Sequence, residues 1–175
     1  AFAALSASQR EAVGRILGSH VHLLWGPPGT GKTSTLAALV MLLATATAAV
    51  AAKAQAQAQD GGCGSRAEAP TLRVLMTALS NANIQHFLDA VRRRRDAEGL
   101  CAADVAVARM DRETGKVVCQ DSGRAATPAA FYRAQRVCVV AGTVWQTRKM
   151  YGQDSPFDLV IWDDASQSKP AELAI

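Results

Sequence analysis

Residues 26–33 read GPPGTGKT, and this stretch decides the fold. It has the pattern Gly-x-x-x-x-Gly-Lys-Ser/Thr, whose glycines let backbone N–H groups turn toward a phosphate at the positive end of a helix. The apolar run HVHLLW of residues 20–25 precedes it, and helix-forming residues follow from Lys32 onward. We therefore predict a strand over residues 20–25, a helix that begins at about Lys32, and a nucleoside triphosphate bound at the loop between them. A Gly-Pro turn that matches by chance is the alternative, which the flanking strand disfavours.

The residues of this phosphate loop are the candidate ATP contacts. Lys32 can reach the β- and γ-phosphates, and the Thr33 hydroxyl can ligate Mg²⁺. We expect ATP and Mg²⁺ as the ligands of the site. The contacts assigned within the loop are Gly26, Pro27, Pro28, Gly29, Thr30, Gly31, Lys32, Thr33 and Ser34.

A phosphate loop needs an acidic partner at the end of a neighbouring strand, which holds Mg²⁺ directly or through water. Residues 157–167 read FDLVIWDDASQ, so an apolar run leads directly into Asp163 and Asp164. We assign Asp163 to the metal, and Asp164 to the attacking water, which it would orient or deprotonate. By themselves, two aspartates after a strand more often mark a solvated strand end. The upstream loop favours a catalytic set of Asp163, Asp164 and Lys32.

The rest of the chain alternates apolar strands with helical patterns. Ile84, Phe87, Leu88 and Val91 form one stripe at helical spacing. Strands that alternate with helices predict a parallel sheet covered by helices on both faces, so the fold class is α/β, and the pattern indicates an incomplete P-loop NTPase domain. Strands are predicted over residues 72–77, 137–141 and 159–162, and helices over residues 6–17 and after a cap at Ser80 or Asn81.

Two segments interrupt this alternation within a single domain that spans residues 1–175. Residues 44–70 are Ala-rich and of low complexity, which predicts a helix that runs out into an inserted surface loop. Residues 100–133 are ambiguous and are interpreted as a small inserted subregion. Their DVAVARM alternation, the ETGK turn and the Val117–Val118 pair predict a hairpin, and a short helix is expected at about residues 129–135.

Composition restricts the function only weakly. The chain has 19 basic and 15 acidic residues and a net charge of +4, which is compatible with nucleic acid without proving it. Its four cysteines include no Cys-x-x-Cys pair, so reduced thiols in an intracellular protein are the plain interpretation, with nucleus or cytoplasm left open. The Ala-rich residues 37–52 are dotted with threonine and are interpreted as too weakly apolar to span a bilayer, so no membrane is expected.

Five segments together resemble the superfamily-1 helicases, in the group of the nonsense-mediated-decay and nuclease-fused replication helicases. LSASQREAV resembles their adenine-reading glutamine motif, LLWGPPGTGKT their motif I, and RVLMTALSNANIQHF their motif Ia. VVAGTV resembles the strand and Thr turn of motif Ic, and FDLVIWDDASQ resembles motif II. The resemblance implies the first RecA-like lobe of an ATP-dependent 5′-to-3′ helicase or translocase. The wording TVWQ is closest to the DNA-directed members.

The resemblance also implies roles for individual residues. Gln9 would read the adenine, and Gln167 would couple the nucleotide site to the bound nucleic-acid strand. Ser80, Asn81 and Thr143 would contact the backbone of single-stranded nucleic acid, with DNA favoured over RNA. Each has a simpler alternative: Gln9 completes a capping box with a serine three residues earlier, Ser80 and Asn81 are ordinary helix caps, and Thr143 can serve as a turn residue alone.

Two further features have a structural and a functional interpretation. The run Arg92, Arg93, Arg94 and Arg95 follows a helical pattern. We favour a structural interpretation, in which these cations interact with the negative end of the helix dipole, over a phosphate-binding site. Trp145 lies beside a predicted strand, where core packing is favoured over base stacking.

Departures from the family pattern bear on activity. Asp164 stands where the family has glutamate, and Leu79 and Gln85 replace the usual proline and aspartate of motif Ia. A second RecA-like lobe, which carries arginines that complete the site, is expected C-terminal to this chain, so the chain alone should bind ATP but hydrolyse it poorly. The alternative function is a hydrolysis-deficient, nucleotide-gated nucleic-acid-binding module. A P-loop kinase or a ring-forming ATPase would not explain Thr143 or Gln167.

Overall fold

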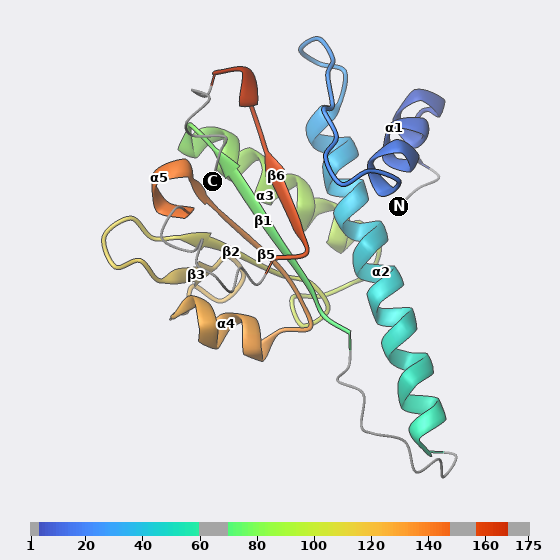
Figure 1. Cartoon of the computed structure of the whole chain (residues 1–175). Coiled ribbons are helices and arrows are strands. Elements are labelled where there is room, and N and C mark those ends of the chain that lie inside the picture. Colours follow the sequence, from blue (N-terminus) through green and yellow to red (C-terminus); the bar gives the residue numbers. More distant parts are fainter. Residues whose placement is uncertain (1–3, 60–69, 148–156, 168–175) are drawn as a thin grey trace.

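The computed structural model describes residues 4–59, 70–147 and 157–167. Its centre is a six-stranded sheet with the strand order β4-β3-β2-β5-β1-β6 (Figure 1). The strands are β1 (Leu72–Ala78), β2 (Ala106–Met110), β3 (Val117–Cys119), β4 (Ala125–Ala126), β5 (Val137–Thr143) and β6 (Leu159–Trp162). The helices are α1 (Ala7–Leu17), α2 (Lys32–Gln59), α3 (Asn81–Ala97), α4 (Pro128–Ala134) and α5 (Val144–Thr147), with a 3₁₀ turn, η3 (Ala165–Gln167).

The strands β2, β5, β1 and β6 are parallel. β1 lies between β5 and β6, with Leu72 opposite Val137 and Val74 opposite Leu159. On its other side β5 pairs with β2, and β3 and β4 continue the sheet antiparallel. The hairpin predicted within residues 100–133 is therefore confirmed, and it extends the same sheet. Because parallel strands end at one edge, the segments after β1, β5 and β6 lie close together there.

Helices cover both faces of the sheet. On one face, α2 and α3 bury Met41 and Phe87 against the inward-facing residues of β1 and β5. On the other face, α4 places Phe131 and Tyr132 over Cys138 and its neighbours on β5 and β2. This arrangement confirms the predicted α/β fold with helices on both sides of a largely parallel sheet (Figure 1).

Serine side chains cap the first turns of α1 and α3. Ser6 accepts a hydrogen bond from the Gln9 backbone, and the Gln9 side chain accepts one from the Ser6 N–H, which makes a capping box. Ser80 caps α3 by accepting a bond of 3.1 Å from the Asn83 N–H. Both predicted helices are confirmed, and the whole predicted stripe of α3 is buried: Ile84, Phe87, Leu88 and Val91.

The long helix α2 is the one predicted to follow the phosphate loop. It continues through the first part of the Ala-rich segment to Gln59, and the glycines of that segment lie outside the described residues. By length and composition Lys32–Ala56 could cross a membrane, with a mean hydropathy of 2.1, so the expectation of a too weakly apolar run is wrong. Within the structure, however, Val40 and Met41 are fully buried against α3 and the sheet, as in the core helix of a folded domain.

Residues 20–25 do not form the predicted strand. They pair with none of the described strands, so β6 is an edge of the sheet. Val21, Leu23 and Trp25 are 91%, 80% and 83% exposed, so their side chains pack against no neighbouring element as those of a buried strand would. An apolar run becomes a strand only where it finds a neighbour for its N–H and C=O groups. The Gly-Pro-Pro sequence that follows offers no N–H donor at either proline.

A buried ion pair ties α3 to the turn between β3 and β4. Arg95 is only 4% exposed and donates two hydrogen bonds of 2.8 Å to Asp121, besides bonds to Asp96 and the Val105 carbonyl. Arg92 also contacts Asp121. These pairs confirm the structural interpretation for Arg92 and Arg95, although Arg95 is buried rather than solvated.

Candidate nucleotide site and nucleic-acid pocket

The phosphate loop has the backbone that its glycines predict. Gly29 and Gly31 have φ angles of 78° and 82°, a left-handed region in which other residues are strained. The Thr35 N–H then donates to the Gly31 carbonyl at 2.8 Å, which begins the hydrogen bonding of α2. The loop residues therefore stand at the N-terminus of a long helix, where backbone N–H groups favour an anion.

Lys32 closes this loop on itself. Its ammonium donates to the carbonyls of Gly26 and Pro27 at 2.7 and 3.1 Å. The Thr30 hydroxyl adds a bond of 2.8 Å to the same Pro27 carbonyl. A phosphate oxygen is a charged and therefore stronger acceptor than a carbonyl, so the ammonium can exchange these partners for a phosphate.

Gln9 contacts the loop from α1. Its Oε1 accepts from the Ser6 N–H at 3.0 Å, while its Nε2 donates to the Thr30 carbonyl at 3.3 Å. A Cβ at Gly31 would come within 2.7 Å of Nε2, so Gly31 also makes room for this contact. The capping role of Gln9 is confirmed, and the side chain lies against the phosphate loop. Its role in reading adenine stays a prediction.

The two aspartates follow β6 at the carboxyl edge of the sheet. The Asp163 N–H donates to the Thr77 carbonyl of β1 at 2.9 Å, which fixes the strand end. Burial, followed by the adjacent Asp164 charge, raises the pKa of Asp163, while Lys32 and His86 oppose this rise. The loop lysine is thus close enough to Asp163 for their charges to interact. That the loop and the two aspartates act together as one nucleotide site stays a prediction.

Asp164 is held by a residue that the sequence analysis did not select. Its Oδ2 accepts a hydrogen bond of 2.6 Å from the side-chain amide of Asn83, in the first turn of α3. Asp164 itself has a φ of 52°, a strained backbone for a residue other than glycine. The sequence analysis interpreted Ser80 and Asn81 as caps and did not consider Asn83, because a cap pattern does not reveal what the following side chains contact.

The donor set at this site fits Mg²⁺. A carboxylate and a hydroxyl are the hard oxygen ligands that Mg²⁺ prefers, and Asp163 and Thr33 supply one of each. Burial and the neighbouring Asp164 charge raise the pKa of Asp163 by disfavouring its charged form, and a bound cation would oppose both effects. No cluster of three or more His, Cys, Asp or Glu suited to another metal occurs among residues 4–59, 70–147 and 157–167.

Beside the loop lies a pocket of about 540 Å³ between the start of α2 and one side of α3. Lys32 and Thr33 line it from α2, and His86 and Arg93 line it from α3. The sequence analysis did not select His86, and it disfavoured a phosphate site for the run that contains Arg93. Their signal is the spacing of seven residues, which places them on one side of the helix next to the buried stripe.

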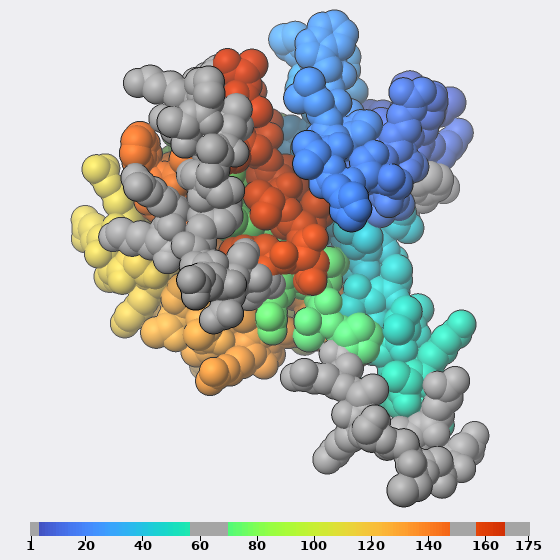
Figure 2. Space-filling model, in the orientation of Figure 1, coloured from blue at the N-terminus to red at the C-terminus, as the bar shows by residue number. Residues whose placement is uncertain are grey.

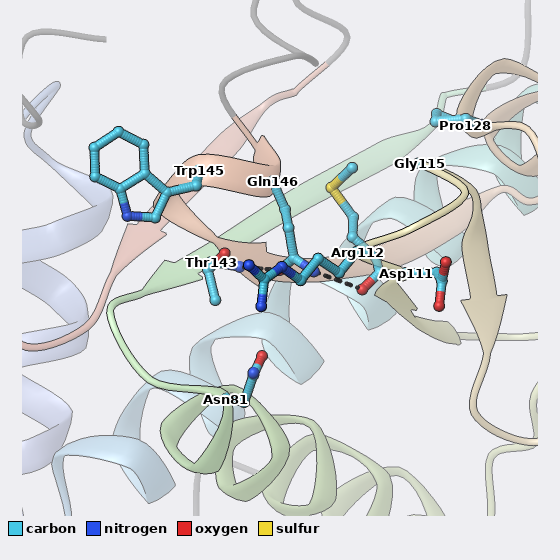
Figure 3. Close-up of a pocket in the computed structure, with 9 residues that line it drawn as sticks. Asn81, Asp111, Arg112, Gly115, Pro128, Thr143, Trp145 and Gln146 are labelled. Atoms are coloured by element: carbon cyan, nitrogen blue, oxygen red, sulfur yellow. Dashed lines mark hydrogen bonds between the residues drawn. The ribbon is translucent and has the colours of Figure 1, made fainter.

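A second pocket, of about 470 Å³, contains two of the three predicted nucleic-acid contacts. Asn81 and Thr143 line it, at the ends of neighbouring elements, as Figure 3 shows. Ser80 is not among its lining residues, and its hydroxyl caps α3. Thus the capping alternative is confirmed for Ser80. Strand contact by all three residues stays a prediction.

Side chains that the sequence analysis did not choose complete this pocket: Met110, Asp111, Arg112, Trp145 and Gln146. Trp145 is 64% exposed, so its predicted placement in the core is wrong. The turn after β5 carries it outward, because Val144 and Thr147 take the buried positions of the short helix α5. Gln167, the proposed coupling residue, lies in η3, which directly follows Asp163 and Asp164 in the sequence.

Comparison with known proteins supports the nucleotide site. The model of the AAA domain family matches residues 4–129, a range that includes α1, the phosphate loop and α3. This domain is found in a family of superfamily-1 helicases, in which it serves as an ATP-dependent, helicase-like motor. No curated protein and no solved structure matches the chain.

Proposed function

Because the chain belongs to the AAA domain family, we propose that it is the first motor lobe of an ATP-dependent nucleic-acid helicase or translocase. One observation carries the proposal: the nucleotide site and the strand pocket meet in the first turn of α3. Asn81 lines the pocket, and Asn83, two residues later, is bonded to Asp164. A motor needs such a connection, because strand binding and hydrolysis must influence each other.

The phosphate loop would hold the triphosphate. Backbone N–H groups at the start of α2 would bind the phosphates, and the Lys32 ammonium would leave the Gly26 and Pro27 carbonyls for phosphate oxygens. Thr33 and Asp163 would hold Mg²⁺, which when bound neutralises charge on the phosphates. Gln9, already against the loop, would contact the adenine.

Asp164 would orient the attacking water and accept its proton. Asn83 would keep the Asp164 carboxylate in one rotamer through their 2.6 Å hydrogen bond. Such positioning is important, because a displacement of about 1 Å can reduce a rate about a hundredfold. Arginines from a second lobe would complete the charge stabilisation, since arginine fingers contribute about 10³–10⁵ in rate.

A second candidate function is a nucleotide-gated binding module without hydrolysis. The strained backbone at Asp164 and the engagement of its carboxylate by Asn83 favour it, because both limit the freedom of the proposed base. ATP would then switch the affinity for a strand without being consumed.

Phosphate release by the full-length protein, with and without single-stranded oligonucleotide, tests these proposals. A motor releases phosphate faster with the strand and unwinds a duplex that carries a 5′ tail. Asn81→Ala with Thr143→Ala should weaken strand binding to a similar degree on different sequences, because backbone contacts carry no sequence information. Strand binding without any phosphate release would establish the binding module instead, and unchanged binding by the double variant would remove Asn81 and Thr143 from the interface.

A further inference from the structure

The pocket at the end of β5, which Asn81 and Thr143 line, contains side chains that contacts to a nucleic-acid backbone alone would not require. An indole stands at its margin with 64% of its surface exposed, although a tryptophan is normally largely buried. Trp145 extends from α5, and Arg112 reaches in from the turn between β2 and β3, with its guanidinium directed toward Thr143 and Asn81 (Figure 3). In the described part of the chain, no hydrogen bond or ion pair occupies this guanidinium.

The pocket is built rather than incidental. Gln146 holds its floor, because it accepts from the Thr143 N–H at 2.7 Å and donates to the Met110 carbonyl at 3.2 Å. Gly142 permits this close approach of β5 and β2, since a Cβ there would come within 3.1 Å of Met110. The ends of β5 and β2 are thereby fixed, and so are the backbone positions from which the side chains of Trp145 and Arg112 extend.

The Arg112 turn is equally rigid. The Asp111 carboxylate accepts from the Glu113 and Thr114 N–H groups and from the Thr114 hydroxyl, all through one oxygen. These bonds lower the pKa of Asp111, so it stays ionised and keeps the turn closed at neutral pH. Arg112 therefore projects from a fixed turn, and its charge is not satisfied by this acid.

We propose that this pocket binds one unstacked nucleotide of the single strand, with its base against Trp145 and its phosphate at Arg112. The proposal rests on the proposed function and adds to it a base-stacking site. A volume of about 470 Å³ is in the range of small-ligand pockets and too small for a duplex. Every base has a π-face, so stacking on Trp145 gives affinity without sequence preference, as a translocating motor requires.

An abasic strand separates the two contacts. Trp145→Ala in the full-length protein should weaken binding of a normal single-stranded oligonucleotide about tenfold, and should change binding of the same strand with abasic sites little. Trp145→Phe should restore most of the affinity. Binding should quench tryptophan fluorescence in the wild type, and the quenching should be smaller in Trp145→Phe.

Arg112→Ala should weaken both strands and lower the slope of log affinity against log salt by about 1, as for one lost phosphate contact. Lys116→Ala is the matched control, because it removes the same charge from the same hairpin outside the pocket and should have a smaller effect. Thymidine and uridine oligomers of equal length distinguish DNA from RNA as the source of the base. If the wild type binds the strand but Trp145→Ala weakens binding of normal and abasic strands equally, the stacking site is refuted. If the wild type binds no strand at all, the proposed function itself is refuted.

Discussion

At the scale of single residues, we expect Lys32 to be the main determinant of triphosphate binding by the loop. Its ammonium now bonds to two loop carbonyls, which a phosphate can replace with a charge-assisted contact. We expect Lys32→Ala to lower Mg-ATP affinity more than tenfold in titration calorimetry, since a hydrogen bond to a charged group contributes about 1.5–3 kcal/mol. Lys53→Ala on the same helix is the control and should bind as the wild type does. Equal affinities of the two variants would refute the assignment of the loop.

The side-chain length of Asp164 gives the second prediction at this scale. Glutamate would extend the carboxylate by one C–C bond, about 1.5 Å, toward a base distance of about 2.6–3.2 Å from the proton of the attacking water. We expect Asp164→Glu to raise the strand-stimulated phosphate release of the full-length protein and Asp164→Ala to lower it. If Asp164→Glu is slower than the wild type, the hydrogen bond from Asn83 has fitted the site to aspartate.

At the scale of elements, the Arg95–Asp121 pair joins α3 to the far end of the hairpin. Hydrogen bonds from Arg95 hold the pKa of Asp121 below its usual value. The pair therefore stabilises the fold above the unfolded-state pKa of about 3.9, and its contribution is lost as the pH falls through the lower folded-state value. Asp121→Asn should cost about 3 kcal/mol at pH 7 in urea unfolding, and the difference from the wild type should shrink toward pH 2.

The control for this pair is Glu11→Gln, which removes an ion pair with Arg15 whose side chains are 63% and 69% exposed. Exposed pairs contribute about 0–1 kcal/mol, so Glu11→Gln should change the unfolding midpoint little. A cost for Asp121→Asn as small as this would mean that Asp96 and the Val105 carbonyl suffice to hold Arg95.

Most elements could be predicted from the sequence because their signals are local. The stripe of α3, the cap at Ser80 and the loop glycines each depend on neighbours within one or two turns. The strand expected at residues 20–25 was wrong, because pairing is a property of two segments and an apolar run specifies only one. The prediction for Trp145 was wrong for a different reason, because a position next to a strand does not determine which side of the following turn faces solvent. Asn83 was missed because its partner, Asp164, lies 81 residues away.

At the scale of the whole molecule, the two candidate sites share one sheet edge and one helix start. β1 contributes at its end to both, because the Thr77 carbonyl holds Asp163 and the chain then enters α3 at Asn81. In Figure 2, β6 and the turn after it (red) lie on the visible surface of the molecule, next to the segment after α1 (blue). A small shift of the first turn of α3 on strand binding would therefore move the partner of Asp164 directly.

The last prediction tests this connection through Asn83. Its amide is the described link between the strand pocket and Asp164, with a bond of 2.6 Å to the carboxylate, and its side chain does not line the pocket. We expect Asn83→Ala in the full-length protein to leave ATP and strand affinities within about twofold, but to reduce the stimulation of phosphate release by the strand about tenfold, a change of about 1.4 kcal/mol in the barrier. Gln85→Ala is the matched control, because Gln85 lies on the same helix as Asn83, donates to Asp89 and to Gln120 beyond β3, and lines neither pocket. Loss of strand affinity in Asn83→Ala would show that the residue supports the pocket rather than the coupling. Full stimulation in Asn83→Ala would mean that strand binding reaches Asp164 by another route, such as the end of β1.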